Sequence, residues 1–340
     1  MNEETLEQKF EEAWKLLEDG DVEAARRLGE ALRDEDPDLA DAAFLLASCS
    51  RAEGDEEAAL VGLAKAAALD PEWSEPELLA ADWLAARGDF EEALPHALAA
   101  VARAEEEDEF LDAIVLKASI ELDLERIGEA RKTLAVLPGP KVADPRADVA
   151  CEIGHLFLAT DQIDIARTWF ERAAGIDPQD PDVHHGLGLA AELDGDDAAK
   201  RLAWVRTLEL DAAADDKEPA RMSEAQVAEI AEAALAELPL RARQLLSQIP
   251  ILISDRPALS DVETGLDPRL MGLFSGTALP EVSSVGGGPQ LAQIILFRRN
   301  LERAAPDDEE LREEIRTTLL HETGHFFGMS EEDLDEVGLG

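Results

Sequence analysis

A Gly-Asp signal that returns every 34 residues constrains the first two-thirds of this chain more than any other feature. The pairs stand at Gly20-Asp21, Gly54-Asp55 and Gly88-Asp89, and an alanine follows each glycine after five residues. A glycine permits the tight reversal between two antiparallel helices, and a small residue at a fixed distance after it lets the second helix cross closely over the first. The period therefore predicts a stack of helix pairs in which each pair contacts its neighbours.

The period is interrupted once and then resumes. A longer unit over about 108–146 contains LPGPKVADP, after which Asp161 stands at the glycine position and Gly195 follows 34 residues later. We count six units over about 6–214. In the sixth unit Lys200 replaces the alanine at the helix crossing, so we expect this last unit to be packed more loosely than the others.

A helix-turn-helix period of 34 residues resembles the tetratricopeptide repeat (TPR). The unit over about 147–180 has the family's small, aromatic and proline positions most fully, at Gly154, Ala166, Phe170, Ala173 and Pro178. The resemblance implies an α-solenoid whose concave face binds a protein or peptide partner.

Composition narrows the class of partner. The chain has 77 acidic and 31 basic residues, a net charge of -46, 4% aromatic residues and no tyrosine. Its abundance of alanine, leucine and glutamate predicts a mostly α protein. Because an acidic surface repels phosphate backbones and anionic lipids, we expect no nucleic acid and no membrane partner. The charge serves solubility or attracts a basic partner.

Two further observations concern the compartment. The N-terminus, MNEETLEQKF, has neither the basic nor the apolar region of a signal peptide, and no apolar run reaches the length of a membrane span. Cys49 and Cys151 lie in apolar helical segments, which favours buried free thiols over a disulfide or a metal site. We therefore expect a cytoplasmic protein.

The sequence pattern changes after about residue 211. A polar stretch, DAAADDKEPARM, predicts a linker at 215–222 between a repeat domain at 1–214 and a second domain at 223–340. Ser223 with Gln226 predicts a capped helix start. IPILISD (249–255) and QIILFRR (293–299) predict two strands, and LMGLFSG (270–276) predicts a strand or a turn. VSSVGGGPQ (282–290) predicts a flexible loop, and a last helix is expected at about 309–327. The second domain is therefore expected to be a small α+β domain.

The last helix contains HETGHFFG, residues 321–328. Residues four apart lie on one face of a helix, so the His321 and His325 imidazoles can both reach one Zn²⁺ at about 2.0–2.1 Å. Glu322 is rotated by about 100° from His321, which suits a general base acting on an activated water. Gly328 is placed to end the helix and turn the chain back.

A catalytic zinc needs a third protein ligand. The two motif histidines are the only ones after position 185, and no cysteine follows position 151, so a third ligand from this domain must be a carboxylate. The spacing HExxHxxGxxZ selects Glu331, with Asp335 next, and Glu332 and Asp333 are close enough in sequence to compete.

Residues from about 223 to 340 resemble the bacterial zincin-like metallopeptidase family, which has a minimal zincin fold. The resembling segments are IPILISDRP, LMGLFSG, IILFRRNLE and LREEIRTTLLHETGHFFGMSEEDL, with DEVG near the end. The resemblance implies His321 and His325 as zinc ligands, Glu322 as base and an acid at or near Glu331.

The domain lacks the tyrosine or additional histidine that commonly steadies an oxyanion. Arg298, Arg299 or a backbone N–H would have to take that role. The strand around Ile294–Phe297 is either a sheet edge that pairs with an extended substrate or an ordinary core strand.

Two functions follow, with a third explanation beside them. The first is a zinc metallopeptidase that hydrolyses a peptide substrate and uses its repeats to dock proteins or peptides. The alternative is a non-catalytic TPR interaction scaffold with a structural or degenerate zincin-like domain. The third is a chance HExxH in an acidic helical protein, and the long resemblance around the motif disfavours it.

Overall fold

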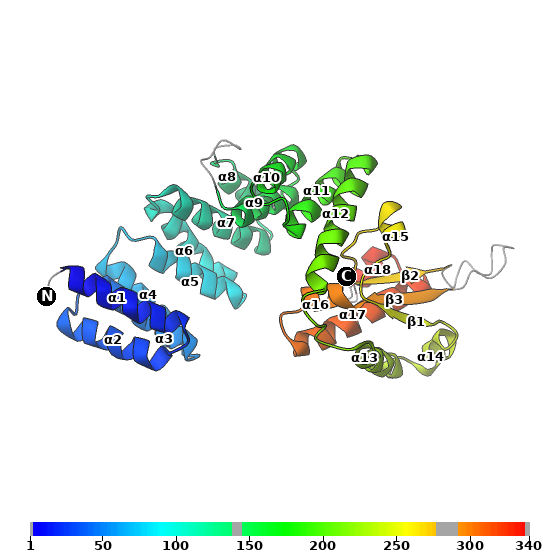
Figure 1. Cartoon of the computed structure of the whole chain (residues 1–340), viewed down its shortest axis with the longest axis horizontal. Helices are drawn as coiled ribbons and strands as arrows, with labels where there is room; N and C mark the ends of the chain where they lie inside the picture. Colours follow the sequence, from blue (N-terminus) through cyan, green and yellow to red (C-terminus); the bar gives the residue numbers. More distant parts are fainter. Residues whose placement is uncertain (1–2, 138–144, 277–291, 337–340) are drawn as a thin grey trace. The chain divides into compact units, whose positions relative to one another are not determined.

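The computed structural model describes residues 3–137, 145–276 and 292–336 (Figure 1). The chain folds into two compact units, Met1–Ile176 and Asp177–Gly340, which we call the N-terminal and the C-terminal unit. The sixth predicted helix pair thus belongs to the C-terminal unit. The loop predicted at 282–290 lies outside the described residues.

The described part of the N-terminal unit consists of five antiparallel helix pairs, each stacked on the next. Their bounds are α1 Glu3–Glu18, α2 Val22–Glu35, α3 Ala40–Ala52, α4 Glu56–Leu69, α5 Glu75–Ala86, α6 Phe90–Arg103, α7 Glu107–Asp123, α8 Ile127–Leu134, α9 Ala147–Ala159 and α10 Ile163–Ile176. This repeat architecture confirms the predicted solenoid class.

The turns within the pairs have the predicted left-handed backbone. Gly20, Gly54 and Gly88 have φ of 82°, 82° and 79°, a region that costs glycine little. Asp161 has φ of 58°, which confirms that it stands at the glycine position. Glu125 takes the same place in the irregular fourth unit, also with φ of 58°, and no glycine marked it in the sequence.

Small residues set the closeness of the helix crossings. The predicted crossing alanines, Ala25, Ala59 and Ala93, are fully buried. Gly154 faces Phe170 so closely that a Cβ on this glycine would lie 2.6 Å from the ring. Both cysteines are buried, as predicted.

The sixth pair is formed by α11 (Pro181–Leu193) and α12 (Asp197–Asp215). Trp204 is 1% exposed and contacts Gly188, where an added Cβ would lie 2.1 Å from the indole. The ammonium of Lys200 lies 5.2 Å from the centre of that ring. The prediction of a loosely packed sixth unit is therefore wrong, because Lys200 extends over Trp204 instead of separating the helices.

The sixth pair also packs against a later helix of the same unit. Trp204 and Leu208 share a buried cluster with Val262 of the short helix α15 (Leu259–Glu263). The sixth pair is thus a packed part of the C-terminal unit.

After α12 the chain forms α13 (Glu224–Glu237) and α14 (Leu240–Leu246). Ser223 and Gln226 form the predicted capping box at the start of α13. Three strands follow: β1 Ile251–Ser254, β2 Gly272–Ser275 and β3 Gln293–Phe297. β1 and β3 fall within the two predicted strand segments, and β2 falls within 270–276, where the sequence predicted a strand or a turn.

The sheet has the order β1-β3-β2. β3 pairs in parallel with β1, with Ile253 opposite Leu296, and antiparallel with β2, where Phe274 is opposite Ile294. Because both sides of β3 are paired, the alternative that placed a substrate-binding edge at Ile294–Phe297 is wrong. β2 is an edge strand of the described sheet. The strand β3 also ends earlier than predicted, since helix α16 (Arg298–Ala304) begins directly after it.

The longest helix of the C-terminal unit is α17 (Asp308–Phe327), and α18 (Glu331–Glu336) follows it. Leu311, Ile315 and Leu319 recur at a spacing of four, and each is at most 1% exposed. They share one core with apolar residues of β3 and α13, and α17 packs against α13, β2 and β3 (Figure 1). This packing fixes the helix that contains HETGHFFG.

Among the helices of the described residues, none combines the length and apolarity required to span a bilayer.

Candidate functional site

Both ends of α17 are defined by local chemistry. The Asp307 carboxylate accepts hydrogen bonds from the backbone N–H groups of Glu309 and Glu310 at 2.8 and 2.9 Å, which caps the helix start. At the other end Gly328 has φ of 83°, as predicted, and the Met329 N–H donates to the Gly324 carbonyl at 3.0 Å. The helix therefore stops shortly beyond the second histidine.

The two motif histidines converge. Their Nε2 atoms are 2.9 Å apart, and the ring planes meet at 80°. Two nitrogens that bind one tetrahedral zinc at about 2.0–2.1 Å are separated by about 3.3 Å. A separation this close to that value fits two ligands of a single ion.

A carbonyl oxygen orients the second imidazole. Nδ1 of His325 lies 3.3 Å from the Met329 carbonyl. A carbonyl can only accept, so Nδ1 donates in this contact, and in a neutral ring Nε2 is then the nitrogen that can bind a metal. A ring held in this way has the tautomer and orientation that metal-binding histidines require.

Glu322 is fixed against the sheet. The residue is only 6% exposed, and its Oε2 accepts a hydrogen bond from the Phe274 N–H of β2 at 2.6 Å. The strand approaches this closely because residue 272 is glycine: a Cβ there would lie 2.6 Å from Cγ2 of Thr318 and 2.9 Å from Cγ of Glu322. Sequence reasoning predicted Glu322 but missed Gly272 and the Phe274 amide, whose only signal was a glycine inside the β-rich run LMGLFSG.

A cavity of about 220 Å³ lies beside this motif, somewhat smaller than the pockets of about 300–1,000 Å³ that enclose drug-sized ligands. It is lined by Leu270, Met271, Gly272, Glu314, Thr317, Thr318, His321 and Glu322. The first motif histidine and the glutamate therefore face one cavity, and its opposite wall is the segment that leads into β2.

The predicted third ligand falls where α18 begins. The side chains of Glu331 and Asp335 lie outside the described residues, so their role as ligands stays a prediction. Glu332 and Asp333 are exposed. The Asp333 carboxylate accepts from the backbone and the hydroxyl of Ser330, both at 2.8 Å, and these bonds lower its pKa. Within the ranges that the structure describes, no cluster of three potential metal ligands is present.

The arginines considered for oxyanion stabilisation are engaged elsewhere. Arg298 donates to the Asp255 carboxylate at 2.9 Å and to the Met222 carbonyl at 3.0 Å. Arg299 donates to the Glu218 carbonyl at 2.6 Å, and neither arginine lines the cavity beside His321. Of the predicted candidates, a backbone N–H is the one that this arrangement favours.

Helix pairs with a 34-residue period, joined to a small mixed sheet and a helix with two converging histidines, define a repeat protein with a zincin-like domain. Family comparison agrees: a model described as zincin-like metallopeptidase matches residues 246–339, and a tetratricopeptide repeat model matches residues 147–180. No curated protein matches the sequence.

Among the solved structures that are similar to this chain, three have sequences that are 14% to 19% identical to it. The structure of pilF from Pseudomonas aeruginosa is 19% identical, covers 61% of this chain and 92% of its own, and has a TM-score of 0.49. PilW, a type IV pilus biogenesis factor, is 17% identical with coverages of 66% and 97% and a TM-score of 0.47. YrrB, a TPR protein with an unusual peptide-binding site, is 14% identical with coverages of 54% and 91% and a TM-score of 0.42.

Proposed function

We propose that this protein is a zinc-dependent metallopeptidase whose repeats dock a protein or peptide. His321 and His325 would hold the zinc, with a carboxylate, Glu331 or next Asp335, as third ligand. The observation that supports this most directly is the 2.9 Å convergence of the two Nε2 atoms beside the buried Glu322 carboxylate.

Zinc at this position would supply Lewis-acid activation of a water molecule and of the peptide carbonyl. The Glu322 carboxylate accepts the proton of the attacking water and returns it to the nitrogen of the departing amine. The Phe274 N–H holds one carboxylate oxygen in place, so the base is oriented before substrate arrives.

The substrate would lie along β2. In an antiparallel pair, alternate residues direct their backbone groups away from the neighbouring strand. The Phe274 N–H reaches Glu322 and not β3, so Gly272 and Phe274 are the residues of β2 whose backbones face outward. An extended peptide can add to such an edge, which would place its backbone beside the cavity that His321 and Glu322 line.

A groove in the N-terminal unit supports the docking role. It has a volume of about 360 Å³ and is lined by residues of α5, α7 and the start of α9. Its apolar lining is Leu78, Leu79, Val115, Leu116 and Val149, and its polar lining is Glu75, Asp82, Asp112, Ser119, Arg146 and Glu152. The ionisable groups are therefore four carboxylates and one guanidinium.

The carboxylates of this groove are partly desolvated and repel one another. Burial raises the pKa of Glu75, and the nearby charges of Glu109 and Asp112 raise it further. Burial and the charges of Asp112 and Asp148 likewise raise the pKa of Glu152, although Arg146 opposes them. A cationic group with an aliphatic stem would contact the apolar lining and offset this repulsion. We therefore expect the docked peptide to present lysine or arginine.

The hydrolase proposal is tested on the full-length protein. Purified protein should contain about one zinc per chain, the occupancy of a three-ligand catalytic site, and should cleave members of a peptide library. Glu322→Gln keeps the side-chain volume and removes the base, so it should retain zinc and lose cleavage. Zinc below about a tenth of an equivalent in metal-replete buffer would refute the proposal.

Docking is tested separately with Glu322→Gln, which cannot consume the ligand. Fluorescent peptides rich in lysine should bind more tightly than acidic peptides, and Asp112→Asn combined with Glu152→Gln should weaken that binding about tenfold or more. Glu171→Gln, an exposed acid of α10 outside the groove, is the matched control. Equal binding by all three variants would refute this docking site.

The same two experiments address the scaffold alternative. Stoichiometric zinc without cleavage, together with binding of basic peptides, would identify a non-catalytic interaction protein. Cleavage that Glu322→Gln abolishes would exclude it.

A further inference from the structure

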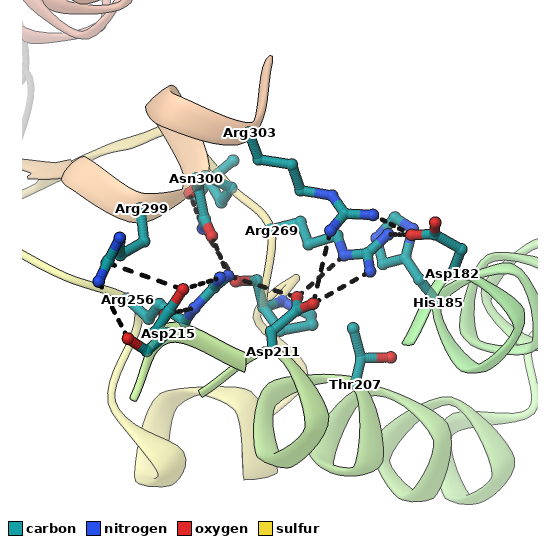
Figure 2. A network of polar contacts seen from close by, with 12 residues as sticks. Asp182, His185, Thr207, Asp211, Asp215, Arg256, Arg269, Arg299, Asn300 and Arg303 are labelled. Atoms are coloured by element: carbon teal, nitrogen blue, oxygen red, sulfur yellow. Dashed lines mark hydrogen bonds and ion pairs between the residues drawn. The ribbon is translucent and has the colours of Figure 1, made fainter. Parts of the chain in front are cut away.

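An ion-pair network joins the sixth helix pair to the rest of the C-terminal unit. Figure 2 shows arginines from α16 and two loops converging on carboxylates of α12. Asp211 is 2% exposed and accepts from Arg269 at 3.1 and 3.3 Å and from Arg256 at 3.3 Å. One helical turn later, Asp215 accepts from the same Arg256 guanidinium through two nitrogens, at 2.6 and 3.1 Å. Buried charges persist only when they are paired in this way.

One partner of Asp211, Arg269, lies in the segment that leads to the proposed active site. Arg269 stands three residues before Gly272, the first residue of β2. The backbone of this segment is held as well: the Asn300 amide donates to the carbonyls of Pro268 and Leu270 at 2.9 and 2.7 Å. Asn300, which is 2% exposed, accepts in turn from Arg256 at 2.7 Å.

α11 holds the same segment from its other end. A ring nitrogen of His185 lies 3.0 Å from the Asp267 carboxylate, which also accepts from the Arg269 N–H at 2.8 Å. Burial alone would raise the pKa of Asp267, but the His185 and Arg269 contacts outweigh it and leave the pKa lowered. Arg269 also pairs with Asp182 of α11 at 2.7 Å.

Contacts from the residues that follow this segment extend to Glu322, the proposed base. Leu270 and Met271 line the cavity that His321 and Glu322 also line, and three residues after Met271 the Phe274 N–H holds the Glu322 carboxylate at 2.6 Å. Fixing residues 267–271 from α11 and α12 therefore fixes both a wall of the cavity and the strand that orients the base.

We infer that Asp211 is a positioning residue for the proposed active site: from the sixth helix pair, through Arg269, it sets the place of β2 and of the Glu322 carboxylate. The inference rests on the proposed hydrolase function for its catalytic consequence. It also makes α11 and α12 part of the catalytic unit, although their sequence belongs to the repeats.

The test compares wild type, Asp211→Ala and a matched control in the full-length protein. The control is Glu121→Gln in the N-terminal unit, where a carboxylate 4% exposed accepts from Lys117 and Thr133 at 2.5 and 2.6 Å. Both changes disrupt a buried polar cluster, but only the first lies in the network. Two readouts are taken well below the melting temperatures: amide hydrogen exchange of Phe274 in zinc-free protein, and kcat and KM with zinc content.

We expect the Phe274 amide to exchange at least tenfold faster in Asp211→Ala and to be unchanged in Glu121→Gln. In the zinc-loaded protein, kcat should fall at least tenfold in Asp211→Ala at equal zinc content, with a smaller change in KM. If Asp211→Ala does not fold, Arg269→Lys replaces it, since lysine keeps the charge and loses the forked geometry.

Unchanged exchange at Phe274, or an equal effect of the control, would overturn the inference. The exchange readout needs neither zinc nor turnover. An inactive wild type would thus refute the hydrolase proposal, while Phe274 exchange alone would still decide whether Asp211 positions β2.

Discussion

Replacing Gly272 with alanine tests whether the close approach of β2 to α17 orients the base. The new Cβ would lie 2.6 Å from Cγ2 of Thr318 and 2.9 Å from Cγ of Glu322, so the strand or the helix must move by several tenths of an ångström. Thr318 cannot easily yield, because a β-branched side chain on a helix has few rotamers. Its hydroxyl is also 3.2 Å from the Glu314 carboxylate.

Overpacking of this kind typically costs about 1–3 kcal/mol of stability. Alanine lowers the conformational entropy of the unfolded chain relative to glycine, which offsets roughly 0.4–1 kcal/mol of this cost. A net loss of about 1–2 kcal/mol corresponds to a melting temperature lower by roughly 2–8 °C in a unit of this size. The hydrogen bond from Phe274 to Glu322 should lengthen as the strand moves. A bond to a charged group is worth about 1.5–3 kcal/mol, so kcat should fall by about tenfold or more.

The assay combines thermal unfolding with peptide cleavage at fixed zinc. Gly128→Ala in α8 is the matched control, since nothing lies within 4 Å of its added Cβ, and it should be neutral or slightly stabilising. Thr318→Ser removes the clashing methyl group and should restore part of the lost stability in the double variant. A Gly272→Ala protein as stable and active as wild type would refute the steric reasoning.

Two further predictions concern stability. Gly328→Ala should lower the free energy of unfolding by about 1–2 kcal/mol, because alanine disfavours the left-handed conformation that residue 328 adopts with φ of 83°; an unchanged urea midpoint would contradict this. Asp267 has a lowered folded-state pKa, so its stabilisation is present above the ordinary aspartate pKa of about 3.9 and is lost as pH falls through the lower folded value. Asp267→Asn should therefore be less stable at pH 7 and should lose less stability on acidification below about pH 4, as monitored by urea titrations at several pH values.

Local sequence patterns predicted much of the fold, because many of its features are determined by residues that are close together in the sequence. The left-handed turns at Gly20 and Gly54, the capping box at Ser223 and the helix end at Gly328 all depend on residues within one or two turns. The convergence of the motif histidines follows from their spacing on a helix, and the structure places their Nε2 atoms 2.9 Å apart.

Features that depend on distant pairings could not be predicted in this way. Strand order is one example, because the sequence of β3 does not state that β1 and β2 flank it. Asp211 is another. The composition of DAAADD predicts the start of a polar stretch between the two domains. Asp211, its first residue, is nevertheless 2% exposed and pairs with Arg269, which lies 58 residues further along the chain. The residue type alone does not distinguish a buried aspartate from an exposed one, because only the tertiary structure determines which aspartates lie beside arginines.

The two proposed activities, peptide docking and peptide hydrolysis, depend on charged groups that differ in their exposure to solvent. The chain has 77 acidic residues and only 31 basic ones, yet the network around Asp211 and Asp215 gathers four arginines: Arg256, Arg269, Arg299 and Arg303. Buried pairs are screened little by salt, whereas the attraction between an open acidic groove and a basic peptide falls within a Debye length of about 8–10 Å at physiological ionic strength.

Raising the salt concentration from about 0.05 to 0.5 M should therefore weaken docking of a lysine-rich peptide by about tenfold or more. The same change should alter kcat for a short uncharged peptide at saturation by less than about twofold, because the groups that hold β2 and Glu322 are paired and largely buried. Measuring both quantities on one preparation compares them directly. A parallel fall of kcat with docking affinity would mean that the groups that orient Glu322 are open to screening, which the burial of Asp211 and Asn300 contradicts.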